Sequence, residues 1–314
     1  MKLTVSSSPH IHDIWNRQKV MFSVVIALLP ALVASLILFW GTRVPAIIGV
    51  SLLTAILTDI AGQRLTNQDL GKINGSAVVT GLLFAFVLPP TTPLWASALG
   101  AFISVALGKY AFGMGNNIFN PALVGRAFLV ASWGAIMTDW MYPGIPDGIT
   151  QATPLAVDAL TTSEQAVYDT IYSYSTLFFG HVGGCIGETS AFALIAGGIF
   201  LIALRIIDWR IPATYIGAVG LITLIAGKDP LFHILSGGLL IGAFFMATDY
   251  VTIPLTTKGR VIFALGCGII TSLFRLYSAT MPEGVMYSIL LMNAAAPLIE
   301  RFTLPKPYGT HGNR

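Results

Sequence analysis

The chain has 314 residues, of which 55% are hydrophobic and only 10% are charged; its mean hydropathy is +0.77 and its formal net charge is +3. A soluble domain carries about 25% charged residues, so this composition excludes an ordinary water-soluble protein. The two cysteines, Cys185 and Cys267, lie in different apolar segments without C-x-x-C spacing, and we expect them to be core residues.

A membrane-spanning helix needs roughly 20 apolar residues. The chain offers ten such segments, which predict an all-α membrane protein: 20–40, 44–61, 74–90, 94–112, 118–135, 190–206, 211–227, 231–248, 261–279 and 284–301. The residues before the first segment are largely polar, and no small-residue cleavage site follows it. We therefore expect the first segment to remain as a membrane helix rather than to be removed as a signal peptide.

The basic residues predict the orientation of these segments. An even number of spans places both termini on one side. With the termini in the cytoplasm, thirteen of the 17 Lys and Arg, Lys109 among them, fall inside, and Arg126 lies within the membrane. Three fall outside: Arg43, Lys228 and Arg275. The positive-inside rule thus predicts a multi-pass membrane protein with both termini cytoplasmic.

A long acidic loop separates the two halves of the chain. No Lys or Arg occurs between Arg126 and Arg205, and residues 136–180 contain five acidic residues: Asp139, Asp147, Asp158, Glu164 and Asp169. We predict that this loop lies on the outer face. Thr189 follows it directly, so we expect Thr189 at the outer membrane surface.

Five spans on each side of the loop would give the two halves opposite orientations. Residues 81–86 of the third span resemble residues 238–244 of the eighth, and proline and threonine clusters follow both runs. We predict an inverted repeat with broken third and eighth helices. The domains would be residues 1–135, the first five-helix repeat; 136–186, the outer loop; and 187–314, the second repeat.

The sequence Gly187-Glu188-Thr189-Ser190 stands at the entrance of an apolar run that has no charged residue. A helix N-terminus has unpaired N–H groups and partial positive charge, which suit a phosphate group. A threonine hydroxyl there could also be esterified to a phosphate. The alternative is that Thr189 or Ser190 is simply the N-cap.

Three asparagines, Asn116, Asn117 and Asn120, precede Pro121 at the entrance of the fifth span. They favour capping and turn formation. The functional alternative is amide hydrogen bonding to a flavin ring or a quinone. Both roles can hold at once.

Arg126 lies about two turns into the same span. A permanent charge at that depth needs a partner or a water-filled cavity. Either an ion pair with an acidic residue or contact with a flavin phosphate would meet this need.

Asp59, His233 and Asp249 lie within or at the ends of the second and eighth spans. Ionisable groups there are candidates for ion or proton passage, although interfacial placement is favoured for Asp59 and Asp249. Lys109 and Arg260 are predicted to extend to the membrane surface.

Other classes of site are missing from the sequence. It contains no P-loop, no G-x-G-x-x-G, no clustered Cys/His metal site and no basic aromatic face for nucleic acid. We therefore expect no metal site and no nucleic-acid partner.

Several segments together resemble the D subunit of the Rnf electron transport complex: 6–11, 74–83 with 88–90, 117–122, 187–191, 246–249 and 284–297. The B subunit of the sodium-pumping NADH:quinone reductase is similar in the same segments. That subunit usually has a longer N-terminal extension than the roughly 20 residues that precede the first span here, which favours the Rnf protein.

The resemblance implies FMN joined to Thr189 by a phosphoester bond, with Glu188 and Ser190 beside it. An FMN transferase of the ApbE type on the outer face would make this bond. It also implies two inverted five-helix repeats like those of urea and ammonium channels, and a non-covalent riboflavin whose ligands it does not identify.

The function implied is a flavoprotein subunit of a bacterial or archaeal cytoplasmic (inner) membrane that relays electrons between ferredoxin and NAD, coupled to Na⁺ or H⁺ transport. Such a relay needs no acid–base catalytic residue. Its partners would be the A, B, C, E and G subunits of the Rnf complex, and membrane lipid. Two alternatives remain: the B subunit of the quinone reductase, which needs a quinone pocket, and a cofactor-free urea- or ammonium-type channel, which would be colourless.

Overall fold

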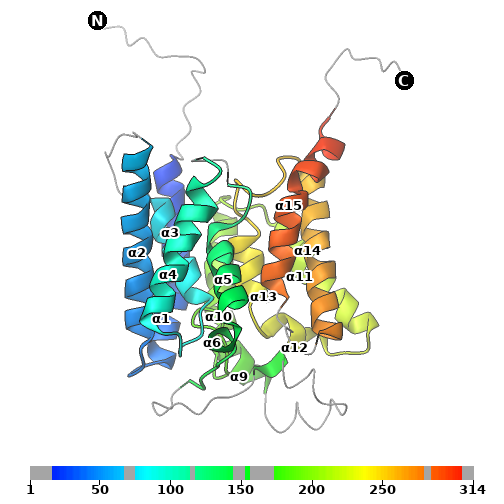
Figure 1. Cartoon of the computed structure of the whole chain (residues 1–314). Coiled ribbons are helices and arrows are strands. Elements are labelled where there is room, and N and C mark those ends of the chain that lie inside the picture. Colours follow the sequence, from blue (N-terminus) through cyan, green and yellow to red (C-terminus); the bar gives the residue numbers. More distant parts are fainter. Residues whose placement is uncertain are drawn as a thin grey trace, which may run out of the picture.

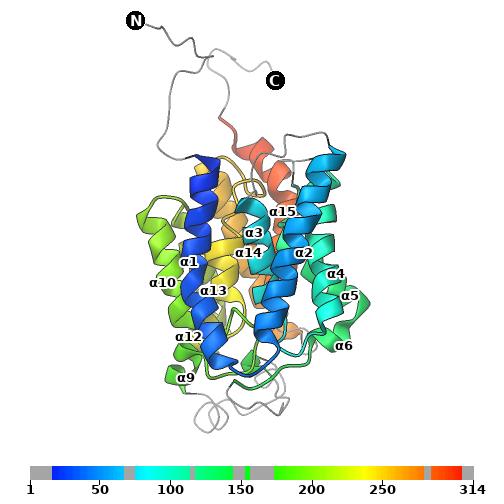
Figure 2. The same ribbon diagram turned by 90° about the vertical axis from the view of Figure 1, so that its left-hand side faces the viewer.

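The computed structural model of the protein describes residues 16–66, 75–113, 117–143, 153–155, 173–278 and 284–305. These residues form helices joined by short connections, so the prediction of an all-α protein is confirmed. The first helix begins and the last helix ends at the same end of the helical body (Figures 1 and 2). We call this end the terminal end, and the opposite end, where α9 lies, the distal end.

The first half of the body is built from five apolar helical segments. They are α1 (Arg17–Leu38), α2 (Val44–Leu65), α3 (Gly75–Phe86), α4 (Leu94–Val105), extended by the π-helical turn η1 (Ala106–Tyr110), and α5 (Pro121–Ser132). Two short helices follow, α6 (Gly134–Met137) and α9 (Tyr174–Phe179). Proline in the first turn of α2 and α5 favours their starts, because its missing N–H would be unpaired there anyway.

The second half begins with α10 (Ala191–Ala203) and α11 (Arg210–Ile225). A broken segment follows, made of α12 (Pro230–Leu235), α13 (Leu239–Ile241) and the π-helical turn η2 (Gly242–Met246). The long helices α14 (Thr257–Tyr277) and α15 (Val285–Thr303) complete it. A side-chain oxygen caps α10, α12 and α14, so these starts are encoded locally.

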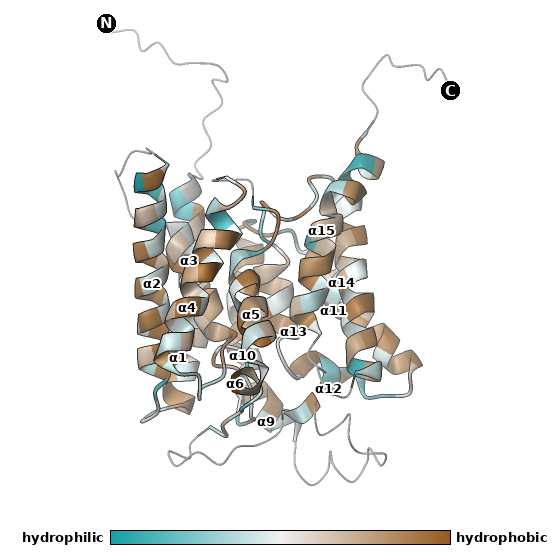
Figure 3. Ribbon diagram, in the orientation of Figure 1, coloured by the Kyte–Doolittle hydropathy of each residue, from teal (hydrophilic) through white to brown (hydrophobic). Residues whose placement is uncertain are grey.

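The surface of the body is that of a multi-pass membrane protein. Among the described residues, helices α1, α2 and α14 are long and apolar enough to cross a membrane, and five apolar helices are shorter. Large hydrophobic side chains such as Ile37, Leu57 and Leu221 are more than half exposed. Hydrophobic residues follow the helices along their length, whereas hydrophilic residues gather toward the ends (Figure 3). Each of the ten predicted segments overlaps a helix.

The packing of helices follows a similar order in the two halves of the chain. Helix α2 packs on α3 and α4, and α4 on α5; likewise α11 packs on α12 and α14, and α14 on α15. Helix α1 starts at the terminal end, whereas α10 starts near α9 at the distal end (Figure 2). The predicted breaks are present: α3 stops at Phe86 before a non-helical stretch, and residues 236–238 separate α12 from α13.

Candidate functional site

The segment that leads into α10 is inserted into the helical body rather than lying on it. Residues 182–190 are all buried. The Ile186 N–H donates to the Leu88 carbonyl at 3.0 Å, and the Gly187 N–H donates to the Phe86 carbonyl at 2.8 Å. A Cβ on Gly187 would overlap the Phe86 side chain, so only glycine allows this approach. The segment thus pairs with the break that follows α3.

Glu188 brings the same segment against the second broken helix. Its carboxylate is 4% exposed, and Oε1 accepts a hydrogen bond from the Cys185 N–H at 3.1 Å. Its Oε2 lies 2.5 Å from where a Cβ on Gly238 would be, at the break between α12 and α13. Residues 185–188 are therefore held between the two broken helices, one from each half of the chain.

Thr189 and Ser190 have different structural roles. The Ser190 hydroxyl oxygen caps α10 by accepting a hydrogen bond from the Ala193 N–H at 3.4 Å. Within the described residues, the Thr189 hydroxyl makes no hydrogen bond. The N-cap alternative therefore applies to Ser190, and the Thr189 hydroxyl is left for another use.

Thr189 lies at the distal end and is buried there within the helical body. It is 3% exposed, and Gly180 packs on it so closely that an added Cβ would lie 2.9 Å from the Thr189 carbonyl carbon. Gly180 ends α9 in the left-handed region, with φ of 100°, which turns the chain back over Thr189. Residues 182–186, which we assigned to the outer loop, belong to this buried segment.

Arg275, which was counted among the outside charges, is in the last turn of α14 and is only 2% exposed. Its guanidinium donates to the carbonyls of His233 and Ser236, the latter at 3.1 Å. The carbonyls at a helix C-terminus lack partners within the helix, so Arg275 caps the C-terminal end of α12 beside the break. His233 is fully buried on α12.

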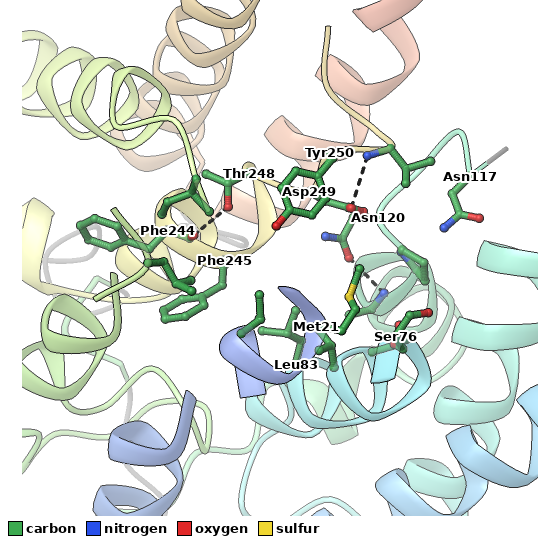
Figure 4. Close-up of a pocket in the computed structure, with 18 residues that line it drawn as sticks. Met21, Ser76, Leu83, Asn117, Asn120, Phe244, Phe245, Thr248, Asp249 and Tyr250 are labelled. Atoms are coloured by element: carbon green, nitrogen blue, oxygen red, sulfur yellow. Dashed lines mark hydrogen bonds between the residues drawn. The ribbon is translucent and has the colours of Figure 1, made fainter. Parts of the chain in front are cut away.

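A cavity of about 110 Å³ lies between α1, α3, α5 and η2 (Figure 4). Aromatic and polar side chains line it, including Asn117, Phe244, Phe245, Thr248 and Tyr250. Helix α5 and η2 come from different halves of the chain, so the cavity lies between the two predicted repeats.

Asn120 closes one side of this cavity and ties the two halves together. Its Oδ1 accepts hydrogen bonds from the N–H groups of Ala122 and Leu123, which confirms the predicted N-cap of α5. Its Nδ2 donates to the Met246 carbonyl at 3.2 Å, and its backbone N–H donates to Asn293 Oδ1 at 3.2 Å. The Asn120 amide is thus occupied by structural bonds.

Asn117 differs from Asn120 in having an unpaired polar atom. It lines the cavity, and its Oδ1 is buried without a hydrogen-bond partner in the described part of the chain. A buried carbonyl oxygen without a partner is costly, so this atom suits an N–H or O–H donor of a ligand. Asn116 lies outside the described residues.

The three candidates for ion passage lie on different elements of the described structure. Asp249 lines the cavity, and its Oδ1 accepts a hydrogen bond from the Val251 N–H at 3.4 Å. Burial raises the pKa of Asp249 to about 6. Asp59 and His233 lie on α2 and α12, and no hydrogen bond within the described ranges joins any two of the three.

Asp59 and Lys109 are buried against each other. The prediction that Asp59 lies at the membrane interface is therefore wrong, and so is the prediction that Lys109 extends to the membrane surface. Lys109 Nζ lies 2.5 Å from Asp59 Oδ1. Gln63 and the Tyr110 hydroxyl also donate to this carboxylate, at 2.7 and 2.9 Å. Arg126 is buried in α5, as expected of a charge deep in the fifth span.

Sequence reasoning missed Arg275, Asn293 and Gly238. Arg275 falls inside the predicted segment 261–279, and a charge within a predicted span was the signal that identified Arg126. For Asn293 a polar amide in an apolar helix was a comparable signal. Gly238 has significance only through the position of Glu188, which the sequence does not reveal.

Comparisons with known proteins agree with this architecture. The chain is 46% identical over 312 residues to the D subunit of the Na⁺-translocating ferredoxin:NAD⁺ oxidoreductase complex of Acetobacterium woodii, covering 98% of this chain and 96% of the relative. It is 44% identical over 321 residues to the D subunit of the proton-translocating ferredoxin:NAD⁺ oxidoreductase complex of Clostridium ljungdahlii, with the same coverage.

The D subunit of the ion-translocating oxidoreductase complex of Escherichia fergusonii is 32% identical over 354 residues, covering 98% of this chain and 99% of the relative. The family model described as "NQR2, RnfD, RnfE family" matches residues 4–309. The chain therefore belongs to the NQR2, RnfD, RnfE family, and within it the relatives named above are all D subunits.

Proposed function

We propose that this chain is the D subunit of an ion-translocating ferredoxin:NAD⁺ oxidoreductase complex, and that it carries a covalent FMN on Thr189. The names of its relatives support the first part. One observation carries the second: Ser190 caps α10, while the hydroxyl of the neighbouring Thr189 makes no hydrogen bond within the described residues. A hydroxyl that the fold does not use can form a phosphoester without loss of a structural bond.

The surroundings of Thr189 fit an attached phosphate. It directly precedes the α10 N-terminus, where unpaired N–H groups and the helix dipole favour a negative charge. The Glu188 carboxylate is directed to the Cys185 N–H and toward Gly238. Because Gly180 packs over Thr189, we expect the segment between α9 and α10 to open before a transferase of the ApbE type can reach the hydroxyl.

When bound, a flavin supplies a group that exchanges electrons singly or in pairs. The contribution of this chain is to hold that group in a fixed place. Hydrogen bonds from Ile186 and Gly187 to the break after α3, and the packing of Glu188 at Gly238, fix the segment that carries Thr189. Placement by two rigid elements suits electron relay, because transfer depends on a constant distance between cofactors.

We also propose that the cavity beside Asn117 binds the non-covalent riboflavin. The unpaired Asn117 Oδ1 matches a ring N–H donor, and Phe244 and Phe245 supply aromatic surface. A three-ring flavin is larger than the cavity of about 110 Å³, so we expect Met21 and Tyr250 at its wall to move apart on binding.

The relatives do not decide which ion is coupled. Two D subunits of similar identity to this chain belong to complexes named for sodium in one case and for protons in the other. Asp59, His233 and Asp249 remain the residues that we predict to take part in ion passage. The other proteins of the Rnf complex remain the predicted partners.

The covalent FMN is tested by the intact mass and the in-gel fluorescence of the purified protein. Thr189→Val should remove both signals, whereas Thr189→Ser, which keeps a hydroxyl, should retain flavin. Ser190→Ala is the matched control, since it removes the neighbouring hydroxyl and weakens only the cap. Covalent flavin in the valine variant contradicts the assignment. A wild-type protein that is colourless would instead support the cofactor-free channel.

A further inference from the structure

A second cavity, of about 420 Å³, lies where the α10–α11 connection meets the start of α14. Three arginines line it, Arg205, Arg210 and Arg260, against a single acid, Asp208. Helix α10 starts at the distal end and α14 starts near the terminal end, so this cavity opens at the terminal end of the body (Figures 1 and 2). It therefore carries excess positive charge at the level where the apolar surface ends.

Asp208 and the backbone fix two of these arginines in place. Arg260 Nη1 lies 3.2 Å from Asp208 Oδ2, and its Nε donates to the Pro254 carbonyl at 3.2 Å. Arg210 lies 3.8 Å from the same carboxylate and stacks over the Trp209 ring at 5.9 Å. One carboxylate cannot neutralise both guanidinium groups, so the cavity retains positive charge from pre-positioned donors.

Arg205 is held in the left-handed backbone conformation, which glycine adopts far more readily than arginine. It ends α10 with φ of 55°, and among the described residues it alone combines a side chain with positive φ. The Arg205 N–H donates to the Ile202 carbonyl at 2.9 Å and the Ile206 N–H to the Leu201 carbonyl at 3.0 Å. These bonds form the Schellman motif, whose left-handed position is usually glycine.

An arginine at this position costs conformational energy that glycine would not. Its guanidinium makes no ion pair or hydrogen bond within the described part of the chain, so no internal contact offsets that cost. A strained residue that lines a cavity indicates a function outside the fold itself. Here that function is to direct a third positive charge at the cavity.

The floor and surroundings of the cavity distinguish a lipid from a free anion. Apolar side chains, Ile202, Ile206 and Ile253, line it between the arginines. Beside it, α14 exposes Ile262 and Leu265, and Trp209 is 58% exposed, as is usual at a membrane interface. A ligand with a phosphate group and apolar chains would satisfy both parts.

We propose that this cavity is a binding site for the headgroup phosphate of an anionic phospholipid, with its acyl chains along α14. Basic pockets between membrane helices commonly bind such headgroups. Arg205, Arg210 and Arg260 would contact the phosphate oxygens through charge-assisted hydrogen bonds. The site is separate from Thr189, and it shares Ile207, Thr248 and Tyr250 with the wall of the first cavity.

Arg205→Gly tests the proposal without a folding ambiguity, because glycine suits the left-handed backbone and removes only the side chain. The probe is dioleoylphosphatidylglycerol added to the complex purified in detergent, with binding to this chain followed by native mass spectrometry. We expect affinity to fall on the order of tenfold, as for loss of one charge-assisted contact, with an unfolding midpoint equal to or above that of wild type. Arg260→Gln should also weaken binding.

The controls separate a lipid site from general charge effects. Arg64→Gln removes one exposed positive charge from the last turn of α2, which lines neither cavity, and should leave the affinity unchanged. Dioleoylphosphatidylcholine should bind to the wild type more weakly than phosphatidylglycerol does. The Arg205→Gly substitution should leave the affinity for phosphatidylcholine unchanged. Three outcomes overturn the proposal: unchanged phosphatidylglycerol affinity in Arg205→Gly, equal binding of inorganic phosphate, or no binding to the complex because a partner protein covers the cavity.

Discussion

The carboxylate of Asp59 and the ammonium group of Lys109 lie 2.5 Å apart in a buried site between α2 and the π-helical turn η1. Gln63 and Tyr110 complete the hydrogen bonding of this carboxylate. A buried ion pair is strongly destabilised when one partner is removed, because the other charge is left without compensation. The pair therefore fixes α2 against η1.

We predict that Lys109→Met lowers the stability of the protein by about 3–5 kcal/mol, measured by thermal unfolding of the purified complex. Adding Asp59→Asn should recover much of this loss, since asparagine carries no charge and still accepts hydrogen bonds from Gln63 and Tyr110. Arg64→Met, on the exposed last turn of α2, serves as the control. Additive losses in the double variant would show that the two residues do not act as a pair.

Alanine substitutions at Gly187 and Gly184, two glycines of one segment, should differ sharply in their effect on folding. A Cβ at Gly187 would overlap Phe86, whereas a Cβ at Gly184 has its nearest neighbour at 3.7 Å, in the Thr189 side chain. Gly187→Ala should therefore reduce the yield of folded protein or its covalent flavin, and Gly184→Ala should preserve both. Membrane yield and in-gel fluorescence per polypeptide measure the two effects. Equal tolerance of both substitutions would mean that residues 185–188 do not pair with the break after α3.

The sequence identified features that depend on local pattern. Apolar runs located the helices, and Pro121 after Asn120 located a capped helix start, because both signals lie within a few neighbouring residues. The breaks in the third and eighth spans were expected from proline and glycine for the same reason. Thr189 was found through its position before an apolar run, with the resemblance supplying its chemical role.

Features that depend on contacts between distant segments could not be predicted. Periodicity and charge counts treat each span separately, so Lys109 was predicted to extend to the membrane surface and the burial of Arg275 was not predicted. Lys109 is paired with a residue 50 positions earlier, and Arg275 caps a helix about 40 positions earlier. The burial of Thr189 follows from the return of Gly180 over it, which no local signal indicates.

Removing the Tyr215 hydroxyl should cause a modest and measurable loss in the free energy of unfolding. Its hydroxyl lies 2.7 Å from Thr271 Oγ1 and 2.9 Å from Ser288 Oγ, joining α11, α14 and α15. Tyr215→Phe should cost about 1 kcal/mol by thermal unfolding, because the Thr271 and Ser288 hydroxyls still bond to each other at 2.8 Å. Tyr215→Ala should cost more than about 3 kcal/mol, on the order expected when a large buried ring leaves a cavity. A phenylalanine variant as unstable as the alanine variant would contradict this division between hydroxyl and ring.

The orientation of the chain is testable with single cysteines, because the native Cys185 and Cys267 are both buried and should give little background labelling. Ala226 is exposed after α11 at the distal end, and Lys258 is exposed in the first turn of α14 at the terminal end. The excess of Lys and Arg predicted inside remains even when the buried Lys109 and Arg275 are left out, so we expect a cytoplasmic terminal end. With an impermeant thiol reagent on intact cells, Ala226→Cys should be labelled and Lys258→Cys should be labelled only after the cells are opened. The reverse pattern would place Thr189 toward the cytoplasm, and a transferase acting from the outer face could then not attach its flavin.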